Sequence, residues 1–157
     1  MAEGVIEQGF QERVLVVNRV AKKIKGGDKI GFAALVAVGD GKGKLGMGYG
    51  KAQDLRTAVE KARRRAKAKI ISVPIVGTTI PHRIKVKSGA AEILIKPAPS
   101  GSGLIVGGVI RDLLELAGYQ DVSGKILGTE SKMANAQAVL VALQELAREV
   151  KRSSSPK

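Results

Sequence analysis

The pattern of hydrophobic and polar positions predicts three strands and a helix in the first half of the chain. The apolar run at residues 14–17 and the segment "KIGFAALVAVGD" have the length and composition of strands, and "KLGMGYGKA" follows as a third. Beyond Asp54, which suits a helix N-cap, the apolar spacing becomes helical. Its apolar stripe contains Leu55, Ala58, Val59, Ala62, Ala66 and Ile70. The predicted order is therefore β-β-β-α.

The second half also places strands before helices, after the proline-containing link "ISVPIVGTTIPH". In "RIKVKSG", Ile84 and Val86 alternate with lysines, as in a half-buried strand, and "AAEILIKPA" reads as the next strand. The glycine-rich connection "PSGSGLIVGG" leads to the helix "VIRDLLELAG", which Gly118 closes. A short strand in "DVSGKILG" and the helix "MANAQAVLVALQELAREV" complete this half.

These patterns predict an α+β fold of two small α/β domains. We expect a flexible arm at residues 1–12, a first domain at 13–72, a second domain at 73–148 and a disordered tail at 149–157. The second domain is expected to be a β-sheet with two helices.

Charge points to a polyanionic partner. The 157 residues carry a formal net charge of +13, and a surplus of this size is typical of proteins that bind nucleic acid. Residues 1–75 hold 16 Lys and Arg against 7 Asp and Glu, so the first domain is the expected binding surface. No apolar run is long enough to span a membrane. The acidic start does not resemble a signal peptide, which favours an intracellular location.

The stretch "GDGKGKLGMGYGKA" formally contains G-x-G-x-x-G at residues 41–46. A dinucleotide site needs a helix directly after this pattern, and no helix is expected before Asp54. The Walker A pattern fails, and the H-R-D and D-F-G motifs of kinases are absent. A β-hairpin is the simpler interpretation. Gly46, Gly48 and Gly50 then leave one strand face bare, which allows close packing of the helix, close approach of a sugar-phosphate chain, or both.

No catalytic constellation or metal site is predicted. His82 is the only histidine, there is no cysteine, and the carboxylates are scattered. We therefore expect no enzymatic activity and no cofactor. With few aromatic residues available for stacking on single strands, folded RNA held by its phosphates is the expected ligand. The candidate RNA-binding residues are Arg19, Lys22, Lys23, Lys25, Gly26, Gly27, Lys29, Lys42, Lys44, Lys51, Arg63 and Arg64.

Six ordered segments resemble the bacterial fifth small-subunit ribosomal protein family: "NRVAKKIKGG", "FAALVAVGDGKGKLGMGYGKA", "AVEKAR", "VPIVGTTIPH", "ILIKPAPSGSGLIVGGVIRDLLELAG" and "DVSGKILGT". The resemblance covers roughly residues 12–146. It implies a first domain like a double-stranded-RNA-binding domain and a second domain with a left-handed crossover. It also implies a structural, cytoplasmic role in the small ribosomal subunit, in its assembly and in translational accuracy.

The resemblance further implies partners and sites. The partners are small-subunit ribosomal RNA, the fourth and eighth small-subunit proteins, and messenger RNA near the channel through which it enters. The loop at 20–27 matches the family's loop near the spectinomycin site, and Gly103 and Arg111 match its contact with the fourth protein. The segment "GTESKMANAQAVLVAL" departs from the family pattern, so no contact is assigned to residues 129–138.

Two other functions remain open from the residues alone. A free-standing double-stranded-RNA-binding protein or RNA chaperone has the same charge, but does not sediment in stoichiometric amounts with ribosomal subunits. An enzyme that uses a nucleotide at the glycine stretch would bind ATP or GTP.

Overall fold

A computed structural model describes residues 9–154 of the chain, without the side chains at 22–24, 28, 29 and 151–154. The chain forms two compact units. The first combines the chain up to Val38 with Gly46–Ile70, and the second combines Gly39–Leu45 with everything from Ile71 onward. The connection at 39–45 therefore packs with the second unit, although both its neighbours in sequence belong to the first.

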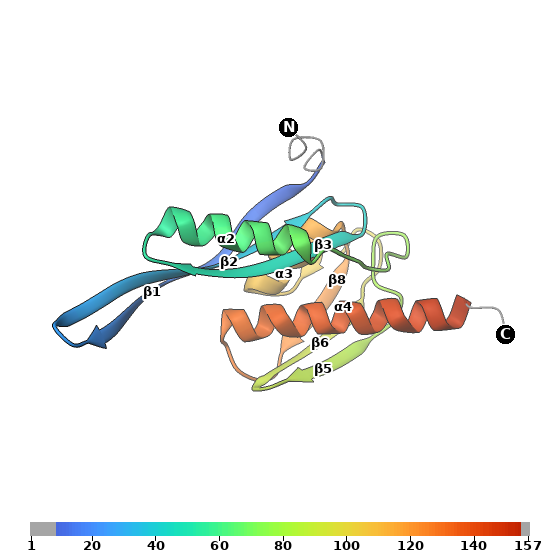
Figure 1. Ribbon diagram of the computed structural model, residues 1–157. Helices are drawn as coiled ribbons and strands as arrows, with labels where there is room; N and C mark the ends of the chain where they lie inside the picture. Colours follow the sequence, from blue (N-terminus) through green and yellow to red (C-terminus); the bar gives the residue numbers. More distant parts are fainter. Residues whose placement is uncertain (1–8, 155–157) are drawn as a thin grey trace. The chain divides into compact units, whose positions relative to one another are not determined.

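The first unit confirms the predicted β-β-β-α order. Its strands are β1 (Gln11–Ile24), β2 (Gly27–Gly39) and β3 (Lys44–Ala52), followed by helix α2 (Leu55–Ala68). The first two residues of β3 and the two-residue strand β4 (Ile71–Ser72), which follows α2, belong to the second unit. The sheet order is β1-β2-β3-β4, and β4 pairs antiparallel with the start of β3. Helix α2 covers one face of β1–β3 (Figure 1). Strand β4 was not predicted, because two residues carry no periodicity.

Small side chains let α2 approach the sheet. Ala58 and Ala62 of the helix are buried against Ala34 and Val36 of β2. The side chain of Asp54 accepts a hydrogen bond from the Thr57 amide at 3.1 Å, which confirms the predicted N-cap. Hydrogen bonding from Thr57, through its side chain first and its amide second, lowers the pKa of the Asp54 carboxyl. The predicted stripe is wrong at Leu55, which is 42% exposed because it opens the helix beyond the end of β3.

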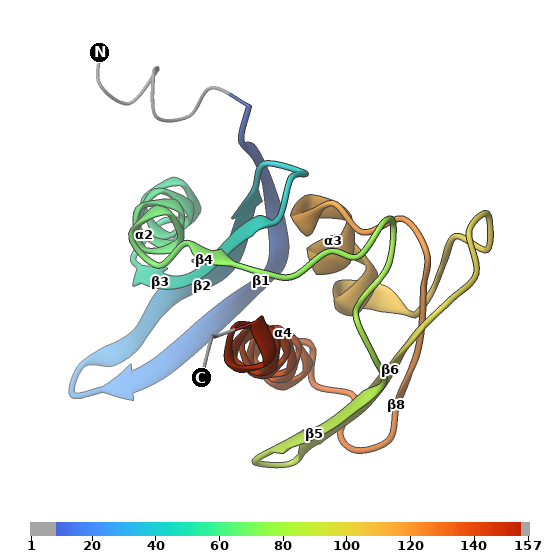
Figure 2. The same cartoon turned by 90° about the vertical axis from the view of Figure 1, so that its right-hand side faces the viewer.

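The second unit is a four-stranded sheet with two helices on one face (Figure 2). Its elements are β5 (Ile84–Ser88), β6 (Ala91–Pro97), β7 (Leu104–Ile105), α3 (Gly108–Ala117), β8 (Val122–Ile126) and α4 (Lys132–Ser154), with strand order β5-β6-β8-β7. Strands β7 and β8 are parallel and joined through α3. The left-handedness of this crossover stays a prediction. The short β7 lies inside the segment that was expected to be only a glycine-rich connection.

The helices of this unit follow their sequence signals closely, with one correction. The apolar side chains Ile110, Leu113, Leu114 and Leu116 of the predicted helix α3 are all buried. Gly118 ends α3 with φ of 110°, as predicted for a glycine cap. The disordered tail expected from residue 149 is wrong as far as Ser154, because α4 continues to that residue. Residues 155–157 lie outside the described part of the chain.

Candidate nucleic-acid interface

The turn between β1 and β2 presents the predicted basic loop. Gly26 and Gly27 have φ of +104° and +143°, a conformation that strains other L-residues, and an added Cβ at either would meet nothing within 4 Å. The loop therefore requires glycine for its backbone conformation, not for space. Lys25 in the turn and Arg19 on β1 are exposed. The side chains of Lys22, Lys23 and Lys29, also predicted to bind RNA, lie outside the described part of the chain.

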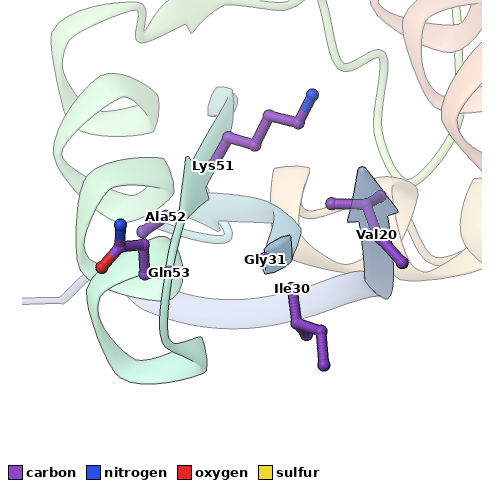
Figure 3. A pocket seen from close by; sticks show the side chains of 7 residues that line it. Val20, Ile30, Gly31, Lys51, Ala52 and Gln53 are labelled. Carbon is purple, nitrogen blue, oxygen red and sulfur yellow. The ribbon is translucent and has the colours of Figure 1, made fainter. Parts of the chain in front are cut away.

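A hollow of about 600 Å³ lies beside this hairpin, at residues from all three long strands (Figure 3). It is lined by Val20, Ala21, Ile30, Gly31, Lys51, Ala52 and Gln53. Figure 3 shows the side chain of Lys51 extending away from Gln53. Because the lining holds one cation and no carboxylate, the hollow supplies positive charge and apolar contact but no acid–base pair.

The glycine-rich turn at 40–44 is not a phosphate cradle. The amides of Gly41 and Gly43 donate to the carbonyls of Leu116 and Ala117 at 2.9 and 2.8 Å, at the end of α3. The Asp40 carboxylate accepts from the amides of Lys42 and Lys44 at 2.8 and 3.1 Å. A phosphate loop binds its ligand through free backbone amides, and these four amides are already paired. Only the exposed side chains of Lys42 and Lys44 remain for an anion.

The bare face of β3 is covered by α2. A Cβ at Gly50 would lie 2.5 Å from the carbonyl oxygen of Ala58 and 2.6 Å from the amide nitrogen of Ala62. An added Cβ at Gly46 or Gly48 would lie 2.3 Å from a carbonyl oxygen of α2. Of the two readings left open by the sequence, helix packing is therefore correct, and no sugar-phosphate chain reaches this face.

The basic residues of α2 differ in how far their charge is neutralised. Arg63 Nη1 lies 3.4 Å from Glu12 Oε1, and Arg63 Nη2 lies 3.0 Å from Glu60 Oε1. Lys67 Nζ lies 3.6 Å from Glu12 Oε2. No ion pair to a described carboxylate is found for the neighbouring Arg64, which is exposed. The two arginines predicted to bind RNA are thus not equivalent.

In the second unit, Asp121 ties the glycine-rich loop to the rest of the fold. Its buried carboxylate accepts from the amides of Gly101 and Gly103 at 3.1 and 2.8 Å and from the Thr78 hydroxyl at 2.5 Å. The Thr78 bond, followed by the Gly103 bond, lowers the pKa of Asp121. Asp121 therefore fixes the backbone of this loop through the Gly101 and Gly103 amides. Added Cβ atoms at these two glycines would meet nothing within 4 Å. The loop thus offers two open glycine positions among the exposed Pro99, Ser100 and Ser102.

Arg111 lies on the exposed side of α3. Its Nε is 3.5 Å from Oε1 of Glu115, one turn further along the helix. An exposed pair of this kind contributes only about 0.2–1 kcal/mol to stability, so Arg111 can exchange this carboxylate for another at little cost.

Other chemistry is sparse among the described residues. They contain no group of His, Cys, Asp or Glu that would hold a metal ion. His82 contacts Glu149 through Nε2 at 2.5 Å and the Arg83 carbonyl through Nδ1 at 2.8 Å, on an exposed surface. No described helix is long and apolar enough to cross a membrane.

Comparison with known families now decides the identity. Residues 10–74 match the family described as ribosomal protein S5, N-terminal domain, and residues 86–151 match ribosomal protein S5, C-terminal domain. The chain belongs to the ribosomal protein S5 family. It is accordingly a structural protein of the small ribosomal subunit that binds ribosomal RNA. Members of this family are non-enzymatic components of the ribosome.

As a ribosomal S5 protein, the chain distributes its predicted RNA-binding residues over both compact units. Arg19, Lys25, Lys51, Arg63 and Arg64 belong to the first unit, whereas Lys42 and Lys44 belong to the second. Sequence reasoning missed Glu12, because its pairing with Arg63 joins residues 51 positions apart. It also missed Asp121, whose three bonds come from distant loops.

Proposed function

We propose that this S5 protein is of the bacterial type and contributes to assembly of the small subunit and to translational accuracy. It binds ribosomal RNA through exposed basic side chains, namely Arg19, Lys25, Lys42, Lys44, Lys51 and Arg64, together with Lys22, Lys23 and Lys29 of the β1–β2 hairpin. Its place of action is the ribosome in the cytoplasm.

The pairing of every amide from Gly41 to Lys44 carries this proposal against a nucleotide-using enzyme. The turn at 40–44 can bind an anion through the side chains of Lys42 and Lys44, but its amides from Gly41 to Lys44 are already paired. Lysine and arginine side chains bind RNA phosphates without a preformed cradle, which fits the excess of 16 basic over 7 acidic residues in positions 1–75.

The second unit supplies the protein contacts. The loop at 99–103, with Gly103, and Arg111 of α3 form the surface for the fourth small-subunit protein. Gly101 and Gly103 allow close approach of a partner at their positions. Asp121 fixes the shape of the loop before the partner arrives, which reduces the entropy lost on binding. The eighth small-subunit protein and messenger RNA near the channel through which it enters are further partners.

Sedimentation of a tagged copy tests this function. In cells that express the tagged chain, it should co-sediment with small ribosomal subunits in a one-to-one ratio and remain there after a wash in moderate salt. A free-standing RNA-binding protein or chaperone would stay mainly at the top of the gradient. Calorimetry with ATP and GTP is the complementary test, since binding of either nucleotide would favour the enzyme.

A further inference from the structure

The basic side chains of α2 differ in whether a carboxylate neutralises their charge. On one flank, Arg63 and Lys67 face β1 and share the carboxylate of Glu12. We call these two residues the paired flank. On the other flank, Lys61 and Arg65 reach β3, where Lys61 Nζ donates to the Lys51 carbonyl at 3.2 Å and Arg65 Nη1 to the Tyr49 carbonyl at 2.7 Å.

The cations on α2 outside the paired flank keep their charge. A bond to a carbonyl orients Lys61 without neutralising it, and it leaves the ammonium other donors. Within the described part of the chain, neither Arg56 nor Arg64 forms an ion pair. Arg56, Lys61 and Arg64 line one hollow on the outer surface of α2, and we call these three cations the open flank.

The open flank surrounds a hollow of about 270 Å³. Its lining consists of Arg56, Thr57, Glu60, Lys61 and Arg64. Arg56 and Arg64 are two helical turns apart, about 12 Å along the axis, so both can reach groups along one polymer chain. Glu60 is the one carboxylate in the lining, and its Oε1 accepts from Arg63 of the paired flank at 3.0 Å. Three cations thus line the hollow, and the carboxylate of its lining, Glu60, is bonded to Arg63 outside it.

We propose that the open flank binds backbone phosphates of ribosomal RNA, and that the paired flank does not. The inference rests on the RNA-binding function of this family and assigns it to particular side chains. Arginine guanidinium suits this ligand because its planar fork donates two hydrogen bonds to one phosphate. Charge already neutralised by Glu12 and Glu60 releases few counterions on binding, so Arg63 contributes little to affinity.

Adjacent arginines on one helix provide the matched test. The full-length chain and its Arg64→Gln, Arg56→Gln and Arg63→Gln variants are titrated with protein-free small-subunit ribosomal RNA over a series of KCl concentrations. Arg64→Gln and Arg56→Gln should each reduce the magnitude of the log–log salt slope by about 0.7–0.9, the value for one lost phosphate contact. Arg63→Gln, which removes the same charge one residue away, should reduce it by less than half as much.

Two further variants separate charge from fold. Arg64→Lys keeps the charge and should keep the salt slope of the unmodified chain. Glu12→Gln removes the carboxylate that Arg63 and Lys67 share, and should therefore tighten binding and steepen the slope. Thermal unfolding midpoints of all variants should match the unmodified chain, because the substituted side chains are at the surface.

The outcomes separate failure of the phosphate assignment on α2 from failure of RNA binding by the chain. Equal loss of slope in Arg64→Gln and Arg63→Gln would overturn the assignment of phosphates to the open flank. Unchanged slopes in all the glutamine variants of α2, with a steep slope in the unmodified chain, would overturn it as well while leaving RNA binding intact. A flat slope in the unmodified chain would instead contradict the electrostatic mode of RNA binding itself.

Discussion

At the scale of the single residue, Gly50 sets how closely β3 and α2 approach. Both atoms that an added Cβ would meet belong to helix backbone, so they cannot turn away as a flexible side chain would. Gly50→Ala should lower the free energy of unfolding by about 1–3 kcal/mol, the usual cost of overpacking. Urea unfolding measures the loss.

Gly107→Ala is the matched control for that substitution. Gly107 also lacks a positive φ, at −93°, and its added Cβ would meet nothing within 4 Å. Its cost should stay below about 1 kcal/mol, which reflects only the poorer N-cap. Equal losses in the two variants would mean that glycine content, not the contact with α2, determines the effect.

His82 is a second residue with a measurable signature. Its bond to the Arg83 carbonyl, assisted by Glu149, raises the pKa of its imidazole above 6.5. A raised pKa means that the protonated form is favoured in the folded state. The resulting stabilisation is present below pH 6.5 and is lost as the pH rises through the folded pKa.

The single histidine makes this prediction direct to test. An NMR titration of the ring protons should give a pKa above 6.5, and Glu149→Gln should bring it down because one favourable partner of the imidazolium is lost. A pKa at or below 6.5 in the unmodified chain would show that the ion pair does not form in solution.

At the scale of elements, the connection between β2 and β3 is stabilised by hydrogen bonds to the end of α3. Its amides cap the end of that helix, and Asp40 pre-forms the turn by accepting from Lys42 and Lys44. Asp40→Ala should therefore speed hydrogen exchange at the amides of Lys42 and Lys44 and cost about 1 kcal/mol of stability. Asp40→Asn retains a side-chain oxygen and should stay near the unmodified chain. Slow exchange in the alanine variant would contradict the role of the side chain.

Sequence pattern predicted the long elements and missed contacts between distant segments. Apolar spacing located α2 and α3, and the caps at Asp54 and Gly118 need only local residues. Strand β4 forms only because Ile71 pairs with Leu45 of β3, which is distant in sequence. The same limit applies to the candidate site. Exposed lysines were identified from charge, whereas the neutralisation of Arg63 depends on Glu12, far away in sequence.

At the scale of the whole molecule, a net charge of +13 predicts how RNA affinity depends on salt. If about five to eight phosphates are neutralised, the log–log slope of affinity against salt concentration should be about −4 to −7. Filter binding to small-subunit ribosomal RNA between low and moderate KCl gives this slope. A value near zero would contradict an electrostatic mechanism, because released counterions are its direct signature.

Arg111 links the second unit to the behaviour of the assembled ribosome. Arg111→Leu removes a pair with Glu115 that is exposed, so folding and RNA affinity should barely change. If the glycine-rich loop and Arg111 meet the fourth small-subunit protein, losing even about 1 kcal/mol at that contact shifts a two-state interface severalfold. Readthrough of a stop codon should therefore change more than growth rate. Arg148→Leu removes a similar exposed pair, with Glu145 on α4, and serves as the control. Equal readthrough in both variants and the unmodified chain would place the accuracy-determining contact elsewhere on the second unit.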